Sequence, residues 1–199
     1  RGYRAQGYRC RLSQEVRVKY ISTRGSAPEK TFSEALLTGL ADDGGLYVPD
    51  KWPSFSGPGS GNYLETAFEV MNLFTAGSLS EETLKKIIDE AYKSFDVQEV
   101  VSLTELDKQI FLMELFHGPT LAFKDIALQL VGELFDYELN NRGEHLTIVG
   151  ATSGDTGSAA IEACKGRQNL DIVILHPSGR VSDVQRRQMT TVDSFNVHN

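Results

Sequence analysis

The sequence predicts an α/β protein, with a small, mainly helical N-terminal domain followed by a parallel-sheet domain of the three-layer α/β/α type. Two observations support this fold class. In the first half, the apolar residues of a charged segment recur at the spacing of a helix with one buried face, namely Leu84, Ile87, Ile88 and Ala91. From about residue 109, strand-like apolar runs alternate with helical segments, which is the pattern of βαβ units.

The N-terminal elements are expected in the following order. A short strand at residues 19–22 precedes a helix from about Ser33 to Leu40, with Ser33 as its cap. Turn residues then lead into a short apolar run, and three glycines with one proline place residues 54–62 in a loop. Two helices follow, at residues 63–74 and 80–94, and acidic side chains occupy the first turn of the second, where the helix dipole favours them.

The second half contains the elements of the predicted sheet domain. The pattern indicates strands at residues 109–115, 145–151 and 171–175, a further strand beginning at 195–197, and helices at 123–140, 157–165 and 182–189. The strand at 145–151 is expected to be buried. Doubly wound sheets bind ligands at a switch point that needs strands from both halves, so we expect this sheet to be incomplete.

Composition excludes several classes of protein. The 27 acidic residues outweigh the 20 basic ones, and a net charge of −7 argues against a nucleic-acid partner. No apolar run approaches the roughly 20 residues that span a bilayer, so no membrane partner is expected. Cys10 and Cys164 are too few for a disulfide framework and favour the reducing cytoplasm, with Cys164 as a small buried side chain.

The first 18 residues differ from the remainder of the chain. They are rich in arginine and poor in acidic residues, but they lack the amphipathic apolar face of a transit peptide. We therefore expect a basic extension that is disordered or artefactual. Nothing in the sequence indicates the oligomeric state.

Lys124 is the first candidate for chemistry. It lies in the segment LFHGPTLAFKD at residues 115–125, where a strand ends, Gly118 makes a turn and a helix begins near Ala122. A cation in the first turn of a helix is opposed by the dipole, and the setting is partly apolar because of Phe116, Leu121 and Phe123. Both effects favour the neutral amine, which is the form that attacks an aldehyde. The alternative is a solvent-exposed lysine that pairs with Asp125.

A glycine-rich turn at residues 148–158 is the second candidate. Gly154 and Gly157 permit tight backbone geometry, and Ser153 and Thr156 add hydroxyl groups to the free N–H groups of a helix N-terminus. Such a turn suits a carboxylate or a phosphate. It matches neither the dinucleotide fingerprint, which needs glycine at Thr152, nor the P-loop. A purely structural turn is the alternative.

Other polar residues are weaker candidates. His117 could contact a ligand or could be an ordinary hydrogen-bonded histidine of the turn. The basic residues of the 179–187 segment could bind a phosphate or form a solvated helix face, and they are Arg180, Arg186 and Arg187. The remaining histidines do not show the spacing of a metal site.

The two central motifs resemble those of one enzyme family. The 115–125 segment resembles the cofactor-lysine motif of threonine synthases, and GATSGDTGSAA at 150–160 resembles the loop that follows it in that family. The segments at 20–25, 42–49 and 188–192 are also similar, so the resemblance covers about residues 19–199. It implies the tryptophan-synthase-β fold, known as fold type II of pyridoxal-phosphate enzymes. Residues 19–105 would be the N-terminal domain, and 106–199 the first part of the cofactor-binding catalytic domain.

The resemblance also implies roles for particular residues. Lys124 would be the catalytic residue that carries pyridoxal 5'-phosphate. Asp155 would approach the cofactor ring near its 3-oxygen, a position that is often asparagine in relatives of this fold. The substrate carboxylate would be held by Ser153, Gly154, Thr156 and Gly157. The implied reaction converts O-phosphohomoserine, a small-molecule substrate, and water to threonine and phosphate.

The family is considerably longer than this chain. The loop that holds the cofactor phosphate lies beyond Asn199 in the family, so we expect the 199 residues alone to be inactive. Two alternatives stay open: a phospholyase that releases 2-oxobutyrate from O-phosphohomoserine, and a non-catalytic binding module. A redox Rossmann protein is disfavoured by the missing fingerprint.

Overall fold

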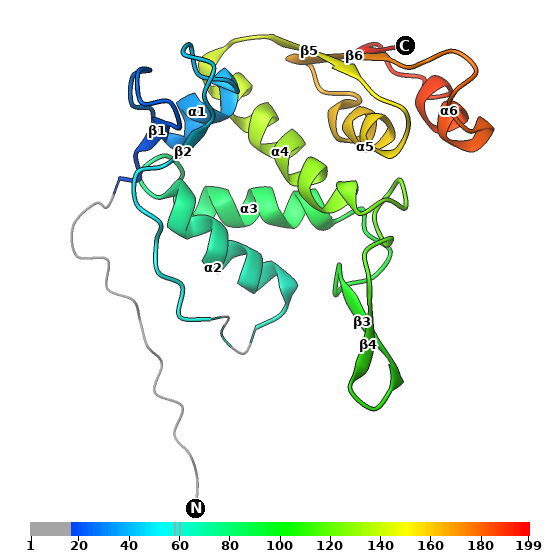
Figure 1. The fold of residues 1–199 in the computed structure, drawn as a ribbon, viewed down its shortest axis with the longest axis horizontal. Helices are drawn as coiled ribbons and strands as arrows, with labels where there is room; N and C mark the ends of the chain where they lie inside the picture. Colours follow the sequence, from blue (N-terminus) through cyan, green and yellow to red (C-terminus); the bar gives the residue numbers. More distant parts are fainter. Residues whose placement is uncertain (1–16, 58, 60) are drawn as a thin grey trace, which may run out of the picture. The chain divides into compact units, whose positions relative to one another are not determined.

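A computed structural model describes residues 17–57, 59 and 61–199 (Figure 1). The predicted basic extension lies almost wholly outside these residues. The chain divides into two compact units. The first consists of the part up to Ser54 together with Asn72–Ser80, and the second consists of Phe55–Met71 together with Glu81–Asn199. The predicted domain division at 105/106 stays a prediction about the family.

The first unit contains a two-stranded sheet and a short helix. β1 (Tyr20–Ser22) pairs antiparallel with β2 (Tyr47–Pro49), and α1 (Phe32–Thr38) lies between them in the chain. The predicted cap, Ser33, is wrong, because the helix begins one residue earlier and Thr31 caps it. Thr31 and Glu34 form a capping box in which each side chain accepts a hydrogen bond from the other residue's backbone N–H.

Asp43 organises the turn that connects these elements. Ser22 donates its hydroxyl proton to Asp43 Oδ1 at 2.7 Å, and the N–H groups of Ser26, Ala27 and Gly45 donate at 2.9–3.0 Å. These bonds, led by the one from Ser22, lower the pKa of Asp43 to about 2. The ionised carboxylate is therefore the form that holds the turn together.

A pH-dependent stability follows from this lowered pKa. The folded pKa lies below the unfolded value of about 4, so the stabilisation is present above pH ~4 and disappears as the pH falls through 2. We expect Asp43→Asn to be less stable than the wild type at pH 6, with a difference that shrinks as the pH falls below 4. Urea unfolding across this pH range measures it, with the exposed Asp42→Asn as the control for lost charge. A difference that stays constant with pH would contradict this account.

The helices of the second unit agree with the predicted segments to within a few residues. They are α3 (Glu81–Tyr92), α4 (Lys124–Arg142), α5 (Asp155–Cys164), α6 (Asp183–Thr190) and the first part of α2 (Tyr63–Thr75). The face predicted to be apolar on α3 is buried, with Leu84 and Ile88 almost fully enclosed. α3 packs against α4 (Figure 1).

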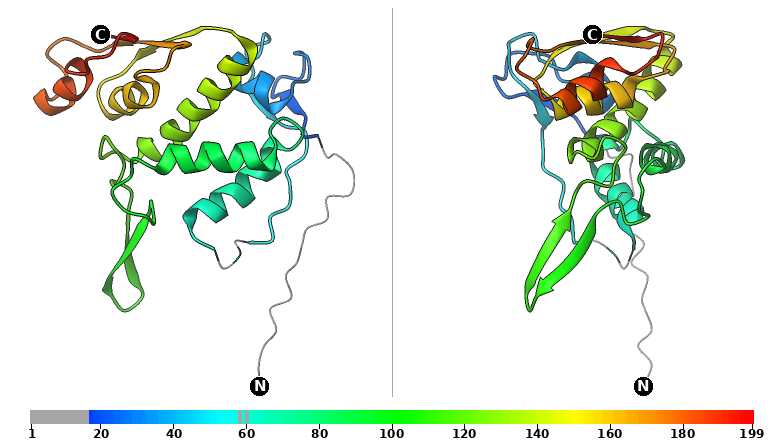
Figure 2. Two further views of the ribbon diagram at one scale, coloured as in Figure 1. Left: turned by 180° about the vertical axis from the view of Figure 1, so that it is seen from behind. Right: turned by 90° about the vertical axis from the view of Figure 1, so that its right-hand side faces the viewer.

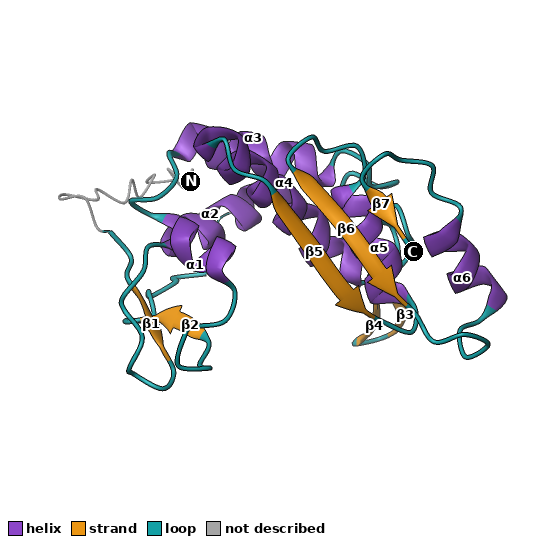
Figure 3. Cartoon of the chain, turned by 90° about the horizontal axis from the view of Figure 1, so that it is seen from above, coloured by secondary structure: helices purple, strands orange, loops and turns teal. Residues whose placement is uncertain are grey.

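The predicted parallel sheet is confirmed. β5 (Leu146–Ala151), β6 (Leu170–Leu175) and β7 (Val197–His198) run parallel in the order β5-β6-β7. Helices α4 and α5 lie on one face of this sheet (Figure 3). Within the described chain the opposite face is open, because Val149 is 67% exposed and Leu175 is 57% exposed. The sheet is therefore incomplete, as predicted, but the prediction that β5 is buried is wrong, since alternate β5 residues are exposed.

α5 packs closely against both α4 and β6. Gly132 of α4 faces the carbonyl oxygen of Ala163, which would lie only 2.5 Å from an added Cβ. Arg167 binds Glu133 at 2.6 Å and Asp136 at 3.3 Å. Cys164 is buried as predicted, and burial raises the pKa of its thiol to about 11.

A hairpin extends from the helices of the second unit (Figures 1 and 2). β4 (Ile110–Glu114) confirms a strand at 109–115, but its predicted place in the parallel sheet is wrong. It pairs antiparallel with β3 (Ser102–Asp107), which was not predicted, in a sheet of its own. Threonine and acidic residues interrupt the apolar residues of β3, so its sequence lacks a clear strand signal. The hairpin's large apolar side chains are exposed: Leu103, Leu106, Ile110, Phe111, Leu112 and Met113. Across the described part of the chain, none of the helices has the length and apolar composition needed to cross a bilayer.

Candidate functional site

Lys124 is the first residue of α4. A short connection leads from the end of α4 into β5, so the helix begins on the side of the sheet where β5 ends (Figure 1). In open parallel sheets this carboxyl edge is where ligands bind. The lysine is half-buried, and its Nζ lies 4.5 Å from the centre of the Phe123 ring. Of the apolar neighbours predicted for this amine, Phe123 is in contact with it, and Phe116, Leu121 and Phe123 are themselves exposed.

The neighbouring Asp125 does not pair with this lysine. Its side chain is fully buried and accepts hydrogen bonds from the Thr120 N–H at 2.8 Å, the Thr120 hydroxyl at 2.9 Å and Gln129 Nε2 at 3.3 Å. Gly118 packs tightly against the Asp125 side chain, because a Cβ added at Gly118 would lie 2.4 Å from the Cβ of Asp125. Asp125 thus holds the turn that precedes Lys124, and among the described residues no ion pair joins the two.

The glycine-rich turn presents unpaired backbone donors. It follows β5 directly, and α5 begins at Asp155 with Gly154 as a cap that has no side chain to offer. Within the described ranges, the N–H groups of Ser153, Asp155 and Thr156 have no hydrogen-bond acceptor. Free N–H groups and the positive end of the helix dipole together favour an anion at this turn.

Side chains of Thr152 and Met189 pack tightly against Gly157 of this turn. An added Cβ at Gly157 would lie 2.4 Å from Thr152 Cγ2 and 2.7 Å from the sulfur of Met189. One turn into α5, the Ser158 hydroxyl is buried and has no partner among the described residues. Only glycine fits at position 157, so the backbone donors keep one arrangement.

Helix α6 connects the two motifs. Gln185 donates from Nε2 to Asp155 Oδ1 at 2.7 Å, and Gln188 donates from Nε2 to the Thr120 carbonyl at 3.3 Å. Met189, fully buried, packs against Gly157. Gln129 adds a second link, because it bonds both Asp125 and the carbonyl of Ala159 on α5. These bonds connect the turn before Lys124 with the turn around Gly154.

These α6 residues were not predicted from the sequence. The helix itself was predicted at 182–189, but only the arginines of the 179–187 segment were candidates for binding a ligand. The signal that could have found them is their spacing, because Gln185, Gln188 and Met189 fall three and four residues apart and share one helical face.

The weaker candidates have ordinary roles in the structure. His117 Nε2 lies 2.8 Å from Glu114, which also accepts the Thr104 hydroxyl at 2.9 Å. The bonds from Thr104 and then His117 lower the pKa of Glu114. Arg186 lies 3.6 Å from Asp183, and Arg180 and Arg187 are exposed, as the solvated-face alternative predicts. The searched residues contain no cluster of three metal-ligating side chains.

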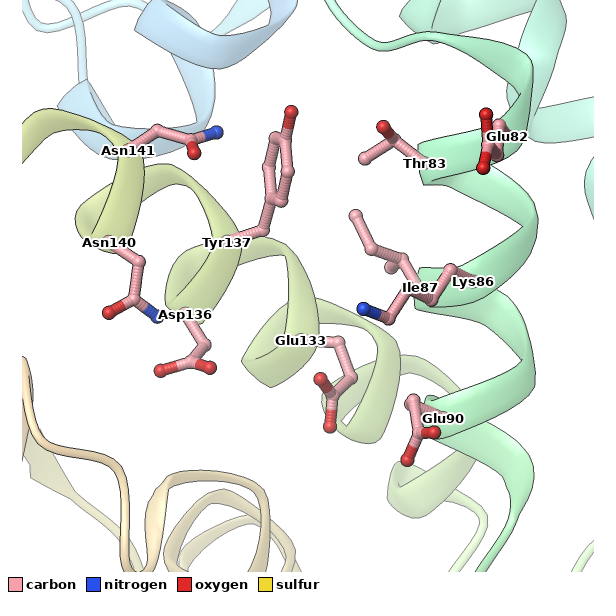
Figure 4. A pocket seen from close by; sticks show the side chains of 10 residues that line it. All are labelled: Glu82, Thr83, Lys86, Ile87, Glu90, Glu133, Asp136, Tyr137, Asn140 and Asn141. Carbon is pink, nitrogen blue, oxygen red and sulfur yellow. The ribbon is translucent and has the colours of Figure 1, made fainter.

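A separate groove lies between α3 and α4 (Figure 4). Its lining is mainly acidic and amide side chains, and Lys86 contributes one amine. Two of these carboxylates, Glu133 and Asp136, already bind Arg167. None of the predicted site residues lines this groove.

The site has features suited to a phosphorylated aldehyde cofactor. An amine at the edge of an apolar setting can form a covalent bond with an aldehyde. The glycine-rich turn after β5 has unpaired N–H donors. It is also closely packed, because a Cβ added at Gly154 would lie 2.5 Å from Gln185 Nε2. The described residues therefore provide an amine at the start of α4 and a turn of unpaired N–H donors after β5.

Comparisons with known proteins agree with the predicted resemblance. Residues 19–92 match the family model described as threonine synthase N terminus. The threonine synthase of Pseudomonas aeruginosa is 54% identical over 187 residues, which are 92% of this chain and 40% of that protein. Threonine synthase-like 2 of Xenopus laevis is 42% identical over 193 residues, which are 91% of this chain and 40% of that protein.

A solved structure shows the same fold. The threonine synthase from Brucella melitensis with bound PLP is 52% identical and superposes with a TM-score of 0.86, covering 91% of this chain and 40% of that one. The chain thus spans about 40% of the length of the relatives it matches.

Proposed function

The chain belongs to the threonine synthase family, whose members match about nine-tenths of its length. We propose that it contributes the part of a pyridoxal-phosphate-dependent threonine synthase that contains the cofactor lysine. The enzyme would convert O-phosphohomoserine and water to threonine and phosphate. One observation carries this proposal: α6 links the turn before the half-buried amine of Lys124 to a turn of unpaired N–H donors. The amine suits an aldehyde and the donors suit an anion.

Each predicted residue has a role in this proposal. Lys124 carries the cofactor and moves protons at the substrate carbons. The substrate carboxylate is bound by the turn of Ser153, Gly154, Thr156 and Gly157, whose N–H groups and hydroxyls are donors. Asp155 would contact the cofactor ring, as the resemblance implies. When bound, pyridoxal phosphate supplies the electron sink that allows the substrate to lose a proton at Cα.

We also place this reaction in the cytoplasm. Support comes from the low cysteine content and from Cys164, which is a buried free thiol. The proposed partner is a small phosphorylated amino acid, and the acidic composition argues against nucleic acid.

A product assay of the full-length gene product tests the proposed reaction. With O-phosphohomoserine as substrate, we expect threonine and phosphate in equal amounts. The similarity to a threonine synthase-like 2 protein keeps one second candidate, the phospholyase. Phosphate with 2-oxobutyrate and little threonine would establish that alternative, and release of no phosphate would support the non-catalytic module.

A further inference from the structure

We propose that Gln185 is a positioning residue of this site, which acts by fixing the carboxylate of Asp155 beside the bound cofactor. The inference rests on the proposed function. Gln185 lies on α6, thirty residues from its partner, and donates from Nε2 to Asp155 Oδ1 at 2.7 Å. An amide donor and an ionised carboxylate form one of the stronger types of hydrogen bond in proteins.

The Asp155 carboxylate determines the orientation of the Gln185 amide, and the Ser182 hydroxyl is compatible with it. Ser182, the cap of α6, donates its hydroxyl proton to Gln185 Oε1 at 2.9 Å while it accepts the Gln185 N–H at 3.3 Å. If the amide were turned over, its carbonyl oxygen would face the Asp155 carboxylate, and two acceptors would meet. The network therefore places the donor group on Asp155.

The Gln185 side chain also lies directly on the glycine turn. An added Cβ at Gly154 would come within 2.5 Å of Nε2 and 2.8 Å of Cδ of Gln185. Glycine at 154 thus has a second function besides backbone geometry, since it lets this amide reach Asp155. Any larger residue at 154 displaces the amide or the helix that carries it.

α6 is held firmly enough for this role. Met189 is fully buried against Gly157, and Gln188 bonds the carbonyl of Thr120. These contacts anchor α6 to both motifs independently of Gln185. Removal of the Gln185 amide should therefore release Asp155 without detaching the helix.

The bond from Gln185 leaves the second carboxylate oxygen of Asp155, Oδ2, available for the cofactor. The Gln185 amide occupies Oδ1, and in the described part of the chain Oδ2 accepts no hydrogen bond. A carboxylate fixed through one oxygen presents the other in a defined direction. Asp155 can then accept a hydrogen bond from the cofactor without a loss of side-chain entropy on binding.

The test uses pyridoxal phosphate and the full-length gene product. We expect Gln185→Leu to weaken cofactor binding about tenfold, which is the scale of one charge-assisted hydrogen bond, and to shift the absorbance spectrum of the bound cofactor. Gln185→Glu should weaken it further, because two carboxylates then face each other. Val184→Ala, on the exposed side of the same helix, is the control and should match the wild type.

A double-mutant cycle separates positioning from general destabilisation. If Gln185 acts through Asp155, then Gln185→Leu changes neither the affinity nor the spectrum once Asp155→Asn is present. Additive effects, or a Gln185→Leu protein with wild-type affinity and spectrum, would overturn the inference while the proposed function stands. Failure of the wild type to bind pyridoxal phosphate at Lys124 would overturn both. Gln185→Met, which keeps the length of the side chain but lacks the amide, gives a second variant should Gln185→Leu not fold.

Discussion

Replacing Lys124 by alanine is expected to abolish covalent cofactor binding and to lower the turnover of O-phosphohomoserine by at least about 10³-fold. The expectation combines two losses. A nucleophilic amine that bonds the cofactor disappears, and so does the group that moves protons at the substrate carbons, which by itself contributes typically about 10²–10⁴-fold. Steady-state kinetics and the absorbance of the bound cofactor in the full-length protein measure both losses.

The structure provides a matched control for this substitution. Lys165, just after the end of α5, pairs with Glu162 and is partly exposed, so Lys165→Ala removes one amine from the same unit without touching the site. We expect near wild-type activity from it. Lys124→Arg keeps the charge but cannot bond the aldehyde, so it should be as inactive as Lys124→Ala. Substantial activity in either Lys124 variant would refute the assigned role.

The second large effect is expected from Asp125→Ala, which should destabilise the protein by about 3 kcal/mol. Asp125 is fully buried, and its loss would leave the N–H and hydroxyl of Thr120 and the amide of Gln129 without their acceptor. Each unsatisfied buried polar group costs roughly 1–3 kcal/mol. Denaturant unfolding measures the change, and we expect the turn before Lys124 to lose its fixed position, so cofactor binding should weaken too.

Graded variants distinguish this hydrogen-bond network from simple packing. Asp125→Asn keeps the shape and one acceptor oxygen, so its loss of stability should be smaller than that of Asp125→Ala. Asp183→Ala, whose side chain is 85% exposed, controls for the removal of one acidic residue and should stay within about 0.5 kcal/mol of the wild type. Equal effects of Asp125→Asn and Asp183→Ala would show that the network contributes little.

Features that depend on local sequence were predicted well. The buried face of α3, the parallel strands and the position of Lys124 in the first turn of its helix follow from residue spacing and turn chemistry. The predicted roles of Ser153, Gly154, Asp155, Thr156 and Gly157 stay predictions, although the free donors expected of that turn are present.

Features that depend on distant partners were missed. β3 exists because it pairs with β4, and its own residues do not form a strand pattern. The Ser33 cap is a different kind of miss, because the Thr31–Glu34 capping box is local and its T-x-x-E pattern is present in the sequence. The bond from Gln185 to Asp155 joins residues thirty apart in the chain, which no local pattern reveals.

One measurement tests the central claim most directly, namely that the Lys124 amine bonds the cofactor. The full-length protein is saturated with pyridoxal phosphate, reduced with borohydride, digested and analysed by peptide mass spectrometry. We predict a phosphopyridoxyl group on the peptide that contains Lys124, and its absence from that peptide in Lys124→Ala. An adduct confined to another lysine, or no adduct at saturating cofactor, would contradict the assignment.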